Sequence, residues 1–316
     1  MTSRRAPAIL NWAGSKARVA KVLAQLDLPR FETYYEPFLG SGAVFLGLAS
    51  AGLISKSFLS DINPRLINVF RAVQMQPNDV VSGLRMHALL DSDVHFSAVL
   101  GRLNARPAED VVDSQVASDT IYLLSQSFHS TWYETRDWQV SMSRRRDAAT
   151  FQPRHQDVVR AAALLQDASV SQVDFRGALR RAELGDLVFL DPPYLYGEDQ
   201  ADQQAYNADR FGASDLGDLS AEMRRLVDLG ANVIFCWGER AQAAVPAGGA
   251  WIEVGRDYVW VSDGLSGGAL SSRLGDGGDS ELADSLPGVA VGVPDIEGRD
   301  HFAALDGQAR LVRHST

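Results

Sequence analysis

Short apolar runs alternate with helical patterns along most of the chain. The run Leu187-Val188-Phe189-Leu190 is continuously apolar, as is typical of strands buried on both faces of a parallel sheet. Other strands are predicted at residues 34–36, 58–59, 170–173 and 232–236, with weaker patterns at 251–254 and 258–261. Strands that alternate with helices predict an α/β fold with a mostly parallel sheet.

The helix signal is clearest after the second predicted strand. Asn63 is a favoured N-cap residue, and Pro64 suits the first helical position. Behind them the apolar residues Leu66, Ile67, Phe70 and Val73 recur at the spacing of one helical face. A helix is therefore predicted to begin at residue 64.

Further helices are predicted on weaker signals. One covers residues 43–49, and residues 77–130 are helix-rich without a strong strand pattern. A polar loop is expected at 197–218, followed by a helix that Ser220 caps and that runs to about residue 229.

The periodicity fades at residue 262. The 55 residues of 262–316 hold ten Gly, nine acidic residues and four Arg, which is typical of a flexible acidic tail. The pattern leaves open whether this tail is disordered or holds a short hairpin and a terminal element.

Composition excludes several classes of protein. The chain has 316 residues, 46% of them hydrophobic, and no apolar run as long as a membrane span needs, so a cytoplasmic protein is expected. Cys236 is the one cysteine and lies in an apolar run, which indicates a buried residue and neither a disulfide nor a metal site.

The formal charge of −10 argues mildly against nucleic acid as a ligand, but whole-chain charge says little about one face. Residues 127–160 contain six Arg against four acidic residues, including Arg144-Arg145-Arg146. This stretch is either a solvated loop or a surface that contacts phosphates.

A glycine turn and an acidic residue follow two successive strands. Gly40-Ser41-Gly42 comes after the strand at 34–36, where open α/β sheets bind ligands and where glycines let the backbone approach them. About twenty residues later, Asp61 ends the next strand, a position from which carboxylates accept hydrogen bonds from ribose hydroxyls. Together they predict an adenosyl-type cofactor.

The most informative motif is Asp191-Pro192-Pro193-Tyr194, directly after the buried strand. Two consecutive prolines fix the backbone and hold the loop rigid, so the Asp and Tyr side chains are expected to project into a cleft. A carboxylate and a carbonyl that accept the two N–H groups of an exocyclic amine leave its lone pair free to attack a sulfonium methyl group. Tyr194 offers a face on which an extruded base can stack.

Four motifs in this order resemble the DNA adenine methylase (Dam-like) family of N6-adenine methyltransferases. They are Asn11-Trp12-Ala13-Gly14-Ser15-Lys16, Glu36-Pro37-Phe38-Leu39-Gly40-Ser41-Gly42, Ser60-Asp61-Ile62-Asn63 and Asp191-Pro192-Pro193-Tyr194. The resemblance covers residues 1 to about 260. It implies a Rossmann-like, S-adenosylmethionine-dependent methyltransferase sheet with helices on both faces and an inserted, mainly helical DNA-recognition region.

The resemblance also implies a role for each motif. Asp191, Pro192, Pro193 and Tyr194 would be catalytic. The cofactor would be S-adenosyl-L-methionine. The residues that bind it would be Trp12, Ala13, Gly14, Lys16, Pro37, Phe38, Gly40, Asp61, Asp174, Phe175 and Asp191. No metal is expected.

The implied domain organisation has three parts. Residues 1–72 and 161–261 would form the catalytic domain, 73–160 the inserted recognition region, and 262–316 the tail. Within the insertion, Trp132, Tyr133, Arg136, Arg144 and Arg145 are candidates for contacts with double-stranded DNA, although the aromatic residues suit a core better. The family's Asn-Gly and Arg-x-Asn signatures are absent there, and the acidic tail replaces its basic segment.

Two alternatives to an active enzyme on adenine in DNA stay open at this level. The divergent recognition segment and the acidic tail suit a cofactor-binding regulator that does not methylate, although its tetrad is intact. A third reading keeps the chemistry and changes the substrate to cytosine N4 or an RNA adenine. We expect a monomer or weak dimer, and a cognate restriction endonuclease is a possible partner.

Overall fold

The computed structural model of this chain describes residues 5–106, 112–130, 132–135, 137–194, 211–238, 245–265, 289–294 and 300–303. Its central feature is a nine-stranded sheet in the order β11-β10-β8-β9-β7-β6-β1-β2-β5. The strands are β1 (Tyr34–Glu36), β2 (Ser57–Asp61), β5 (Ala168–Gln172), β6 (Leu187–Leu190), β7 (Asn232–Trp237), β8 (Ala250–Val254), β9 (Asp257–Val261), β10 (Val289–Pro294) and β11 (Asp300–Ala303).

The middle of the sheet is parallel and its edge is antiparallel. β5, β2, β1, β6 and β7 pair in parallel, whereas β9 pairs antiparallel with both β7 and β8. β10 and β11 form a hairpin that extends the sheet from β8. Of the readings left open for the tail, the short hairpin is therefore present.

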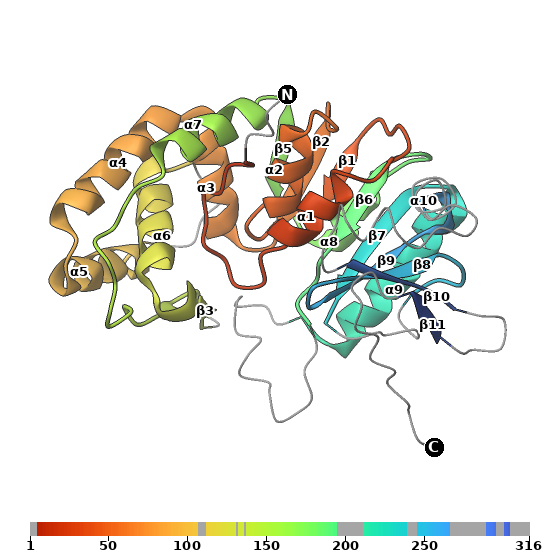
Figure 1. Ribbon diagram of the computed structural model, residues 1–316. Helices are drawn as coiled ribbons and strands as arrows, with labels where there is room; N and C mark the ends of the chain where they lie inside the picture. The colour runs from red at the N-terminus through yellow and green to blue at the C-terminus, as the bar shows by residue number, and fades with distance from the viewer. Residues whose placement is uncertain are drawn as a thin grey trace, which may run out of the picture.

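Helices cover both faces of the sheet (Figure 1). They are α1 (Ala17–Leu23), α2 (Ala43–Ser50), α3 (Pro64–Met75), α4 (Pro77–Leu90), α5 (Asp93–Asn104), α6 (Ser114–Gln126), α7 (His155–Leu164), α8 (Phe175–Leu179), α9 (Ala213–Leu229), α10 (Asp263–Leu265) and the 3-10 turn η1 (Phe128–Ser130). A small hairpin of β3 (Tyr133–Glu134) and β4 (Val140–Ser141) lies outside the main sheet.

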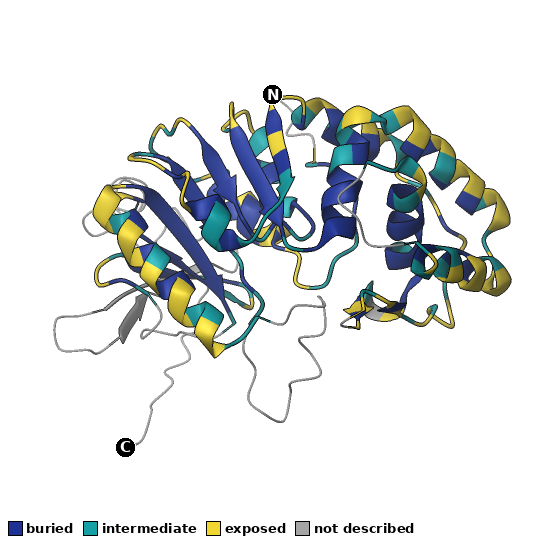
Figure 2. Cartoon of the chain, turned by 180° about the vertical axis from the view of Figure 1, so that it is seen from behind, coloured by how far each residue is buried: buried dark blue, intermediate teal, exposed yellow. Residues whose placement is uncertain are grey.

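Alternate residues of the strands feed two cores, because successive side chains in a strand point to opposite faces. Tyr34, Leu59 and Phe189 pack with α1, α2 and α3 on one face. Tyr35 and Val188 pack with α8 and α9 on the other. The strands are buried throughout their middle, and outer helices such as α4, α5 and α9 keep one exposed face, whereas α3 is buried along most of its length (Figure 2). The predicted fold class is thereby confirmed.

Local signals place most helix starts correctly and one wrongly. Asn63 caps α3 by accepting from the backbone N of Arg65 and Leu66, with Pro64 at the first position, as predicted. The helix that Ser220 was expected to cap begins instead at residue 213. The Asp215 carboxylate accepts from the backbone N of Gly212 at 2.8 Å, so the capping comes from inside the first turn and Ser220 lies within the helix.

Helices α4 to α6 and the β3–β4 hairpin come between β2 and β5 in the chain and lie to one side of the sheet (Figure 1). The domain bounds inferred from the sequence stay a prediction. No helix among the described residues is long and apolar enough to span a membrane. The polar loop predicted at 197–218 falls largely on residues outside the described ones, as does most of the tail.

Candidate active site

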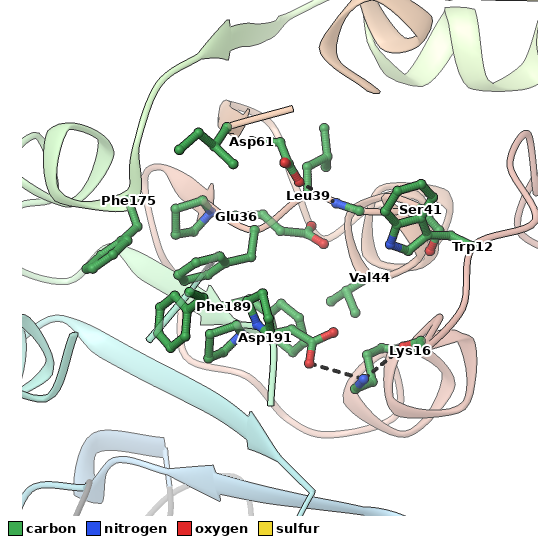
Figure 3. A pocket seen from close by; sticks show the side chains of 18 of the residues that line it. Trp12, Lys16, Glu36, Leu39, Ser41, Val44, Asp61, Phe175, Phe189 and Asp191 are labelled. Atoms are coloured by element: carbon green, nitrogen blue, oxygen red, sulfur yellow. Dashed lines mark hydrogen bonds and ion pairs between the residues drawn. The ribbon is translucent and has the colours of Figure 1, made fainter. Parts of the chain in front are cut away.

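A cavity of about 310 Å³ opens where β1, β2 and β6 end, between these strands and the segment that precedes α1 (Figure 3). The residues predicted to bind the cofactor or to catalyse all line it: Trp12, Ala13, Gly14, Lys16, Pro37, Phe38, Gly40, Asp61, Asp174, Phe175, Asp191, Pro192, Pro193 and Tyr194. Its volume is at the lower end of the range for small-molecule sites. Five separate segments of the chain, at 12–16, 37–40, 61, 174–175 and 191–194, thus meet at one place.

One end of the cavity holds Asp191, directly after β6. Its Oδ1 lies 3.1 Å from Nζ of Lys16, which also lies 3.5 Å from Oδ1 of Asp257 at the start of β9. Lys16 donates a further hydrogen bond of 2.8 Å to the carbonyl of Gly14. The Lys16 side chain is 6% exposed, so this cation is buried between two carboxylates.

Tyr194 completes this end of the cavity. Its hydroxyl donates to Asp191 Oδ1 at 3.3 Å and lies 3.5 Å from Asp257 Oδ1. The centroids of the Tyr194 ring and of the Trp237 ring, at the end of β7, lie 5.3 Å apart. Lys16 Nζ lies 5.1 Å from the centroid of the Tyr194 ring. Gly238 gives the ring room, since a Cβ there would lie 2.8 Å from Tyr194 Cδ2.

Burial dominates the electrostatics of these groups. Desolvation raises the pKa of Asp191, and Lys16 opposes that shift. Desolvation is the largest influence on Lys16 and by itself would lower its pKa, but the neighbouring acidic groups, with Asp191 first among them, together outweigh it, so the pKa of Lys16 lies above its ordinary value. The pKa of Tyr194 is raised by burial and by Asp191, which keeps its hydroxyl a hydrogen-bond donor.

The other end of the cavity is built around Asp61. Asp61 Oδ2 accepts from the backbone N of Gly40 at 3.0 Å, and Oδ1 accepts from the backbone N of Asn63 at the same distance. These bonds fix the carboxylate between the ends of β1 and β2. Gly40 has a φ of +47°, and a Cβ there would lie 3.3 Å from the Trp12 ring, so glycine suits both the conformation and the space.

Aromatic rings flank this end. Phe38 and Phe175 are stacked with centroids 5.4 Å apart, and Phe211, just before α9, meets the edge of Phe38 at 6.0 Å. Asp174 caps α8 by accepting from the backbone N of Arg176, and its carboxylate also pairs with that guanidinium. The side chain predicted to contact a cofactor adenine is therefore already engaged with its own helix.

Glu36, at the end of β1, also lines the cavity, a position that nothing in the sequence indicates beyond its place in a motif. Its Oε2 accepts from the hydroxyl of Tyr34 at 2.7 Å and from the backbone N of Phe45 at 3.0 Å. Burial raises its pKa to about 8, although both hydrogen bonds oppose the shift. A neutral carboxyl group can therefore stand at the cavity wall near neutral pH.

The residues predicted to contact DNA fall into different environments. Trp132 is 1% exposed and its ring centroid lies 6.3 Å from that of Trp12, so it is a core residue, the role that the sequence favoured over contact with a base. Tyr133 is 40% exposed. Arg144 pairs with Asp91 and Asp93, whereas Arg145 is 44% exposed with a 3.8 Å contact to Asp147. Arg136 lies outside the described residues.

Sequence reasoning missed three residues at the catalytic end, Asp257, Trp237 and Gly238. All three come from β7, β9 or the residue that follows β7, and none lies in a recognisable motif. The antiparallel pairing of β7 with β9 brings Trp237 opposite Tyr258, next to Asp257. This pairing is not visible in a single sequence.

Comparison with known proteins now gives the family. The family described as D12 class N6 adenine-specific DNA methyltransferase matches residues 12–235, more than half of the chain. The chain belongs to this family. The predicted resemblance to DNA adenine methylases is thus confirmed, and with it an enzyme that methylates adenine in DNA with a methyl donor.

Relatives of this D12 class enzyme carry matching names. The Type II methyltransferase M1.LlaDCHI of Lactococcus lactis subsp. cremoris is 21% identical over 207 residues, 65% of this chain and 72% of the relative. The DNA adenine methylase of Serratia marcescens is 24% identical over 213 residues, 67% of this chain and 76% of the relative. That of Salmonella typhi is 24% identical over 223 residues, 70% and 76% of the two chains.

Proposed function

We propose that this enzyme transfers the methyl group of S-adenosyl-L-methionine directly to N6 of adenine in double-stranded DNA, with the target base turned out of the helix. The observation that carries the proposal is that one cavity joins the Lys16–Asp191–Tyr194 cluster to the Asp61 carboxylate and the Phe38–Phe175 pair. Direct methyl transfer requires that the donor and the acceptor amine bind side by side, and two adjoining ends of one cavity allow this.

The residues present fit S-adenosyl-L-methionine. Asp61 accepts one backbone N–H on each oxygen and keeps lone pairs for ribose hydroxyls. Phe38 and Phe175 offer apolar faces for an adenine ring, and Gly40 leaves the turn open to close approach. When bound, this group supplies an electrophilic methyl group on sulfur.

Asp191 and the carbonyl of Pro192 would accept the two N–H groups of the target amine and orient its lone pair. Because the prolines fix the backbone after β6, these acceptors are held rigidly and little reorganisation is needed. Tyr194 would stack on the base. Lys16 lies over the Tyr194 ring, and Asp257, 3.5 Å from its Nζ, gives it a second acceptor when a base enters.

The setting of the reaction stays a prediction from the sequence and the names of relatives. We propose a cytoplasmic enzyme that acts as a monomer or weak dimer. The relative named a Type II methyltransferase supports a cognate restriction endonuclease as a partner.

The test is transfer of labelled methyl groups from S-adenosylmethionine to double-stranded DNA, with single-stranded DNA and RNA of the same sequence alongside. Label is expected in N6-methyladenine of the duplex, and Asp191→Ala should abolish it while binding of sinefungin, an unreactive analogue of the donor, survives. Asp167→Ala, which removes an exposed carboxylate far from the cavity, is the matched control. Full turnover by Asp191→Ala, or label confined to cytosine or RNA, would refute the proposal.

A further inference from the structure

The β3–β4 hairpin is hydrogen-bonded to the segment that runs from Asp61, the last residue of β2, into the first turn of α3. Glu134 on β3 accepts from Asn63 Nδ2 at 3.1 Å on Oε2 and from Arg65 Nη1 at 3.0 Å on Oε1. The two side chains of the ion pair are 0% and 3% exposed, so the junction excludes solvent. The hairpin base is thus held by two hydrogen bonds from the segment that leads into α3.

The same segment holds the carboxylate at the cofactor end of the cavity. The backbone N of Asn63 donates to Asp61 Oδ1 at 3.0 Å, while its side chain reaches Glu134. Asp61 Oδ2 in turn accepts from Gly40. A short, buried chain of hydrogen bonds therefore runs from the glycine turn through Asp61 and Asn63 to the hairpin.

Two more contacts join the hairpin to the cavity. Trp132, the residue before β3, packs on Trp12, whose ring forms part of the cavity wall. Arg65 Nη1 also donates to the carbonyl of Trp138 at 2.7 Å, in the turn between β3 and β4. The base of the hairpin is consequently positioned by Trp12, which lines the cavity, and its turn by Arg65 in the first turn of α3.

The junction favours a defined geometry more than it favours stability. Burial raises the pKa of Glu134 to about 7 although Arg65 opposes the shift. The unfavourable free energy of desolvation therefore offsets much of the attraction between the two charges. Arg65 Nη2 is buried and has no hydrogen-bond partner among the described residues, so its desolvation is not compensated. A junction of this kind responds to small shifts of either neighbour.

The hairpin and the turn before it also expose aromatic side chains. Side chains alternate along a strand, so Tyr133 points away from Glu134 and is 40% exposed. Phe128 in η1, which precedes the hairpin, is 56% exposed. Aromatic side chains exposed beside the hairpin suit contact with a nucleic-acid ligand.

We propose that Glu134 is a positioning residue that couples occupancy of the cofactor cavity to the placement of the β3–β4 hairpin, so that donor binding tightens binding of duplex DNA. The inference rests on the proposed function, since it requires both ligands. By linkage, DNA must tighten binding of the donor by the same factor. The segment of Asp61, Asn63 and Arg65 carries the coupling.

The experiment measures the affinity of the full-length protein for a fluorescent DNA duplex with and without saturating sinefungin. Sinefungin should tighten DNA binding at least about fivefold in the wild type, within the usual range of allosteric coupling. Glu134→Gln preserves volume but turns one of two acceptors into a donor that faces Asn63 or Arg65. In this variant the effect of sinefungin should fall below twofold, while DNA affinity without sinefungin stays within about twofold of wild type.

Asp137→Asn is the matched control, because it removes the same charge from an exposed position of the same hairpin and should keep the full coupling. A purely structural role of Glu134 would weaken DNA binding equally with and without sinefungin, and that result would overturn the proposal. Unchanged coupling in Glu134→Gln would do the same.

Hydrogen exchange tests the coupling in the wild-type protein, so the result does not depend on whether a variant folds. Hydrogen exchange of the β3–β4 amides should slow when sinefungin binds in the absence of DNA, and unchanged exchange would contradict the coupling. Failure of the wild type to bind sinefungin or duplex DNA overturns the proposed function and the coupling together. Binding of both ligands without mutual effect overturns the coupling alone.

Discussion

Replacing Gly238 with alanine adds a single methyl group beside the ring of Tyr194. A Cβ on Gly238 would lie 2.8 Å from Cδ2 and 3.2 Å from Cε2 of that ring. Ordinary van der Waals contact begins at 3.4 Å, so the ring must move by at least 0.6 Å, the difference between 3.4 and 2.8 Å. The φ of Gly238 is not positive, and the backbone itself therefore accepts alanine.

The Tyr194 ring has little freedom to move away. Its hydroxyl is tied to Asp191 and approaches Asp257, and its ring packs against Trp237. A displaced ring therefore takes its hydroxyl and the Asp191 carboxylate with it. The methyl group acts on the geometry of the catalytic end and leaves Asp61 and Phe38 at the far end of the cavity untouched.

The expected magnitude follows from the size of the displacement. A misplacement of about 1 Å in an active site can cost on the order of 100-fold in rate, so 0.6 Å predicts a fall in kcat of about 10- to 100-fold. That range corresponds to roughly 1.4 to 2.7 kcal/mol of activation free energy. Overpacking should also lower the free energy of unfolding by about 1 to 3 kcal/mol.

Single-turnover methyl transfer to duplex DNA measures the effect on the chemical step. Sinefungin affinity is expected to stay within about twofold of wild type, and thermal unfolding reports the cost to stability. The control is Gly217→Ala in α9, where an added Cβ has nothing within 4 Å and where alanine stabilises a helix by about 0.5 to 1 kcal/mol. A Gly238→Ala enzyme with wild-type kcat would refute the assigned role of the Tyr194 position.

Other changes separate stability from DNA contact. Because the pKa of Glu36 is about 8 in the fold and roughly 4.3 in the unfolded chain, the folded state holds the extra proton, so stability falls as pH rises between these values. Glu36→Gln removes this fall, which urea unfolding at pH 5 and pH 8 can measure. Arg145→Ala should reduce the slope of log affinity for DNA against log salt by about 1, whereas Arg144→Ala, whose guanidinium serves Asp91 and Asp93, should lower the melting temperature and leave the slope unchanged. Gly42→Ala should cost about 2 to 4 kcal/mol of unfolding free energy in denaturant titrations, because its φ is +63° and its Cβ would lie 2.7 Å from Phe70 Cε1.

The sequence predicted those parts of the fold and site that depend on local chemistry. Leu187–Leu190 is apolar because both its faces are covered, and the prolines that follow fix the direction of the chain. Asn63 and Pro64 form a cap and first turn that need no tertiary partner. Such signals are readable because the residues that interact are neighbours in the chain.

Predictions failed where the deciding interaction is not local or carries no distinctive residue type. The start of α9 was misplaced because its N-cap is Gly212, which offers no side-chain acceptor. For Trp132 the sequence allowed both a core position and a base contact, and the residue that decides, Trp12, lies 120 positions earlier in the chain. Asp257 was overlooked because only the β7–β9 pairing brings it to Lys16.

The net charge illustrates how composition can mislead about a binding face. Residues 262–316 hold nine acidic residues and four Arg, so they carry five of the ten net negative charges, and the other 261 residues carry the remaining five. Several acidic residues in that larger part are also engaged with cations inside the fold. Arg176 alone pairs with Asp174, Asp215 and Asp218. The objection that an acidic chain binds DNA poorly therefore applies to an average over the chain. The charge that a binding face presents depends on which arginines have no close carboxylate partner, and on this ground Arg145, whose contact with Asp147 is 3.8 Å long, is a better candidate for a phosphate contact than Arg144.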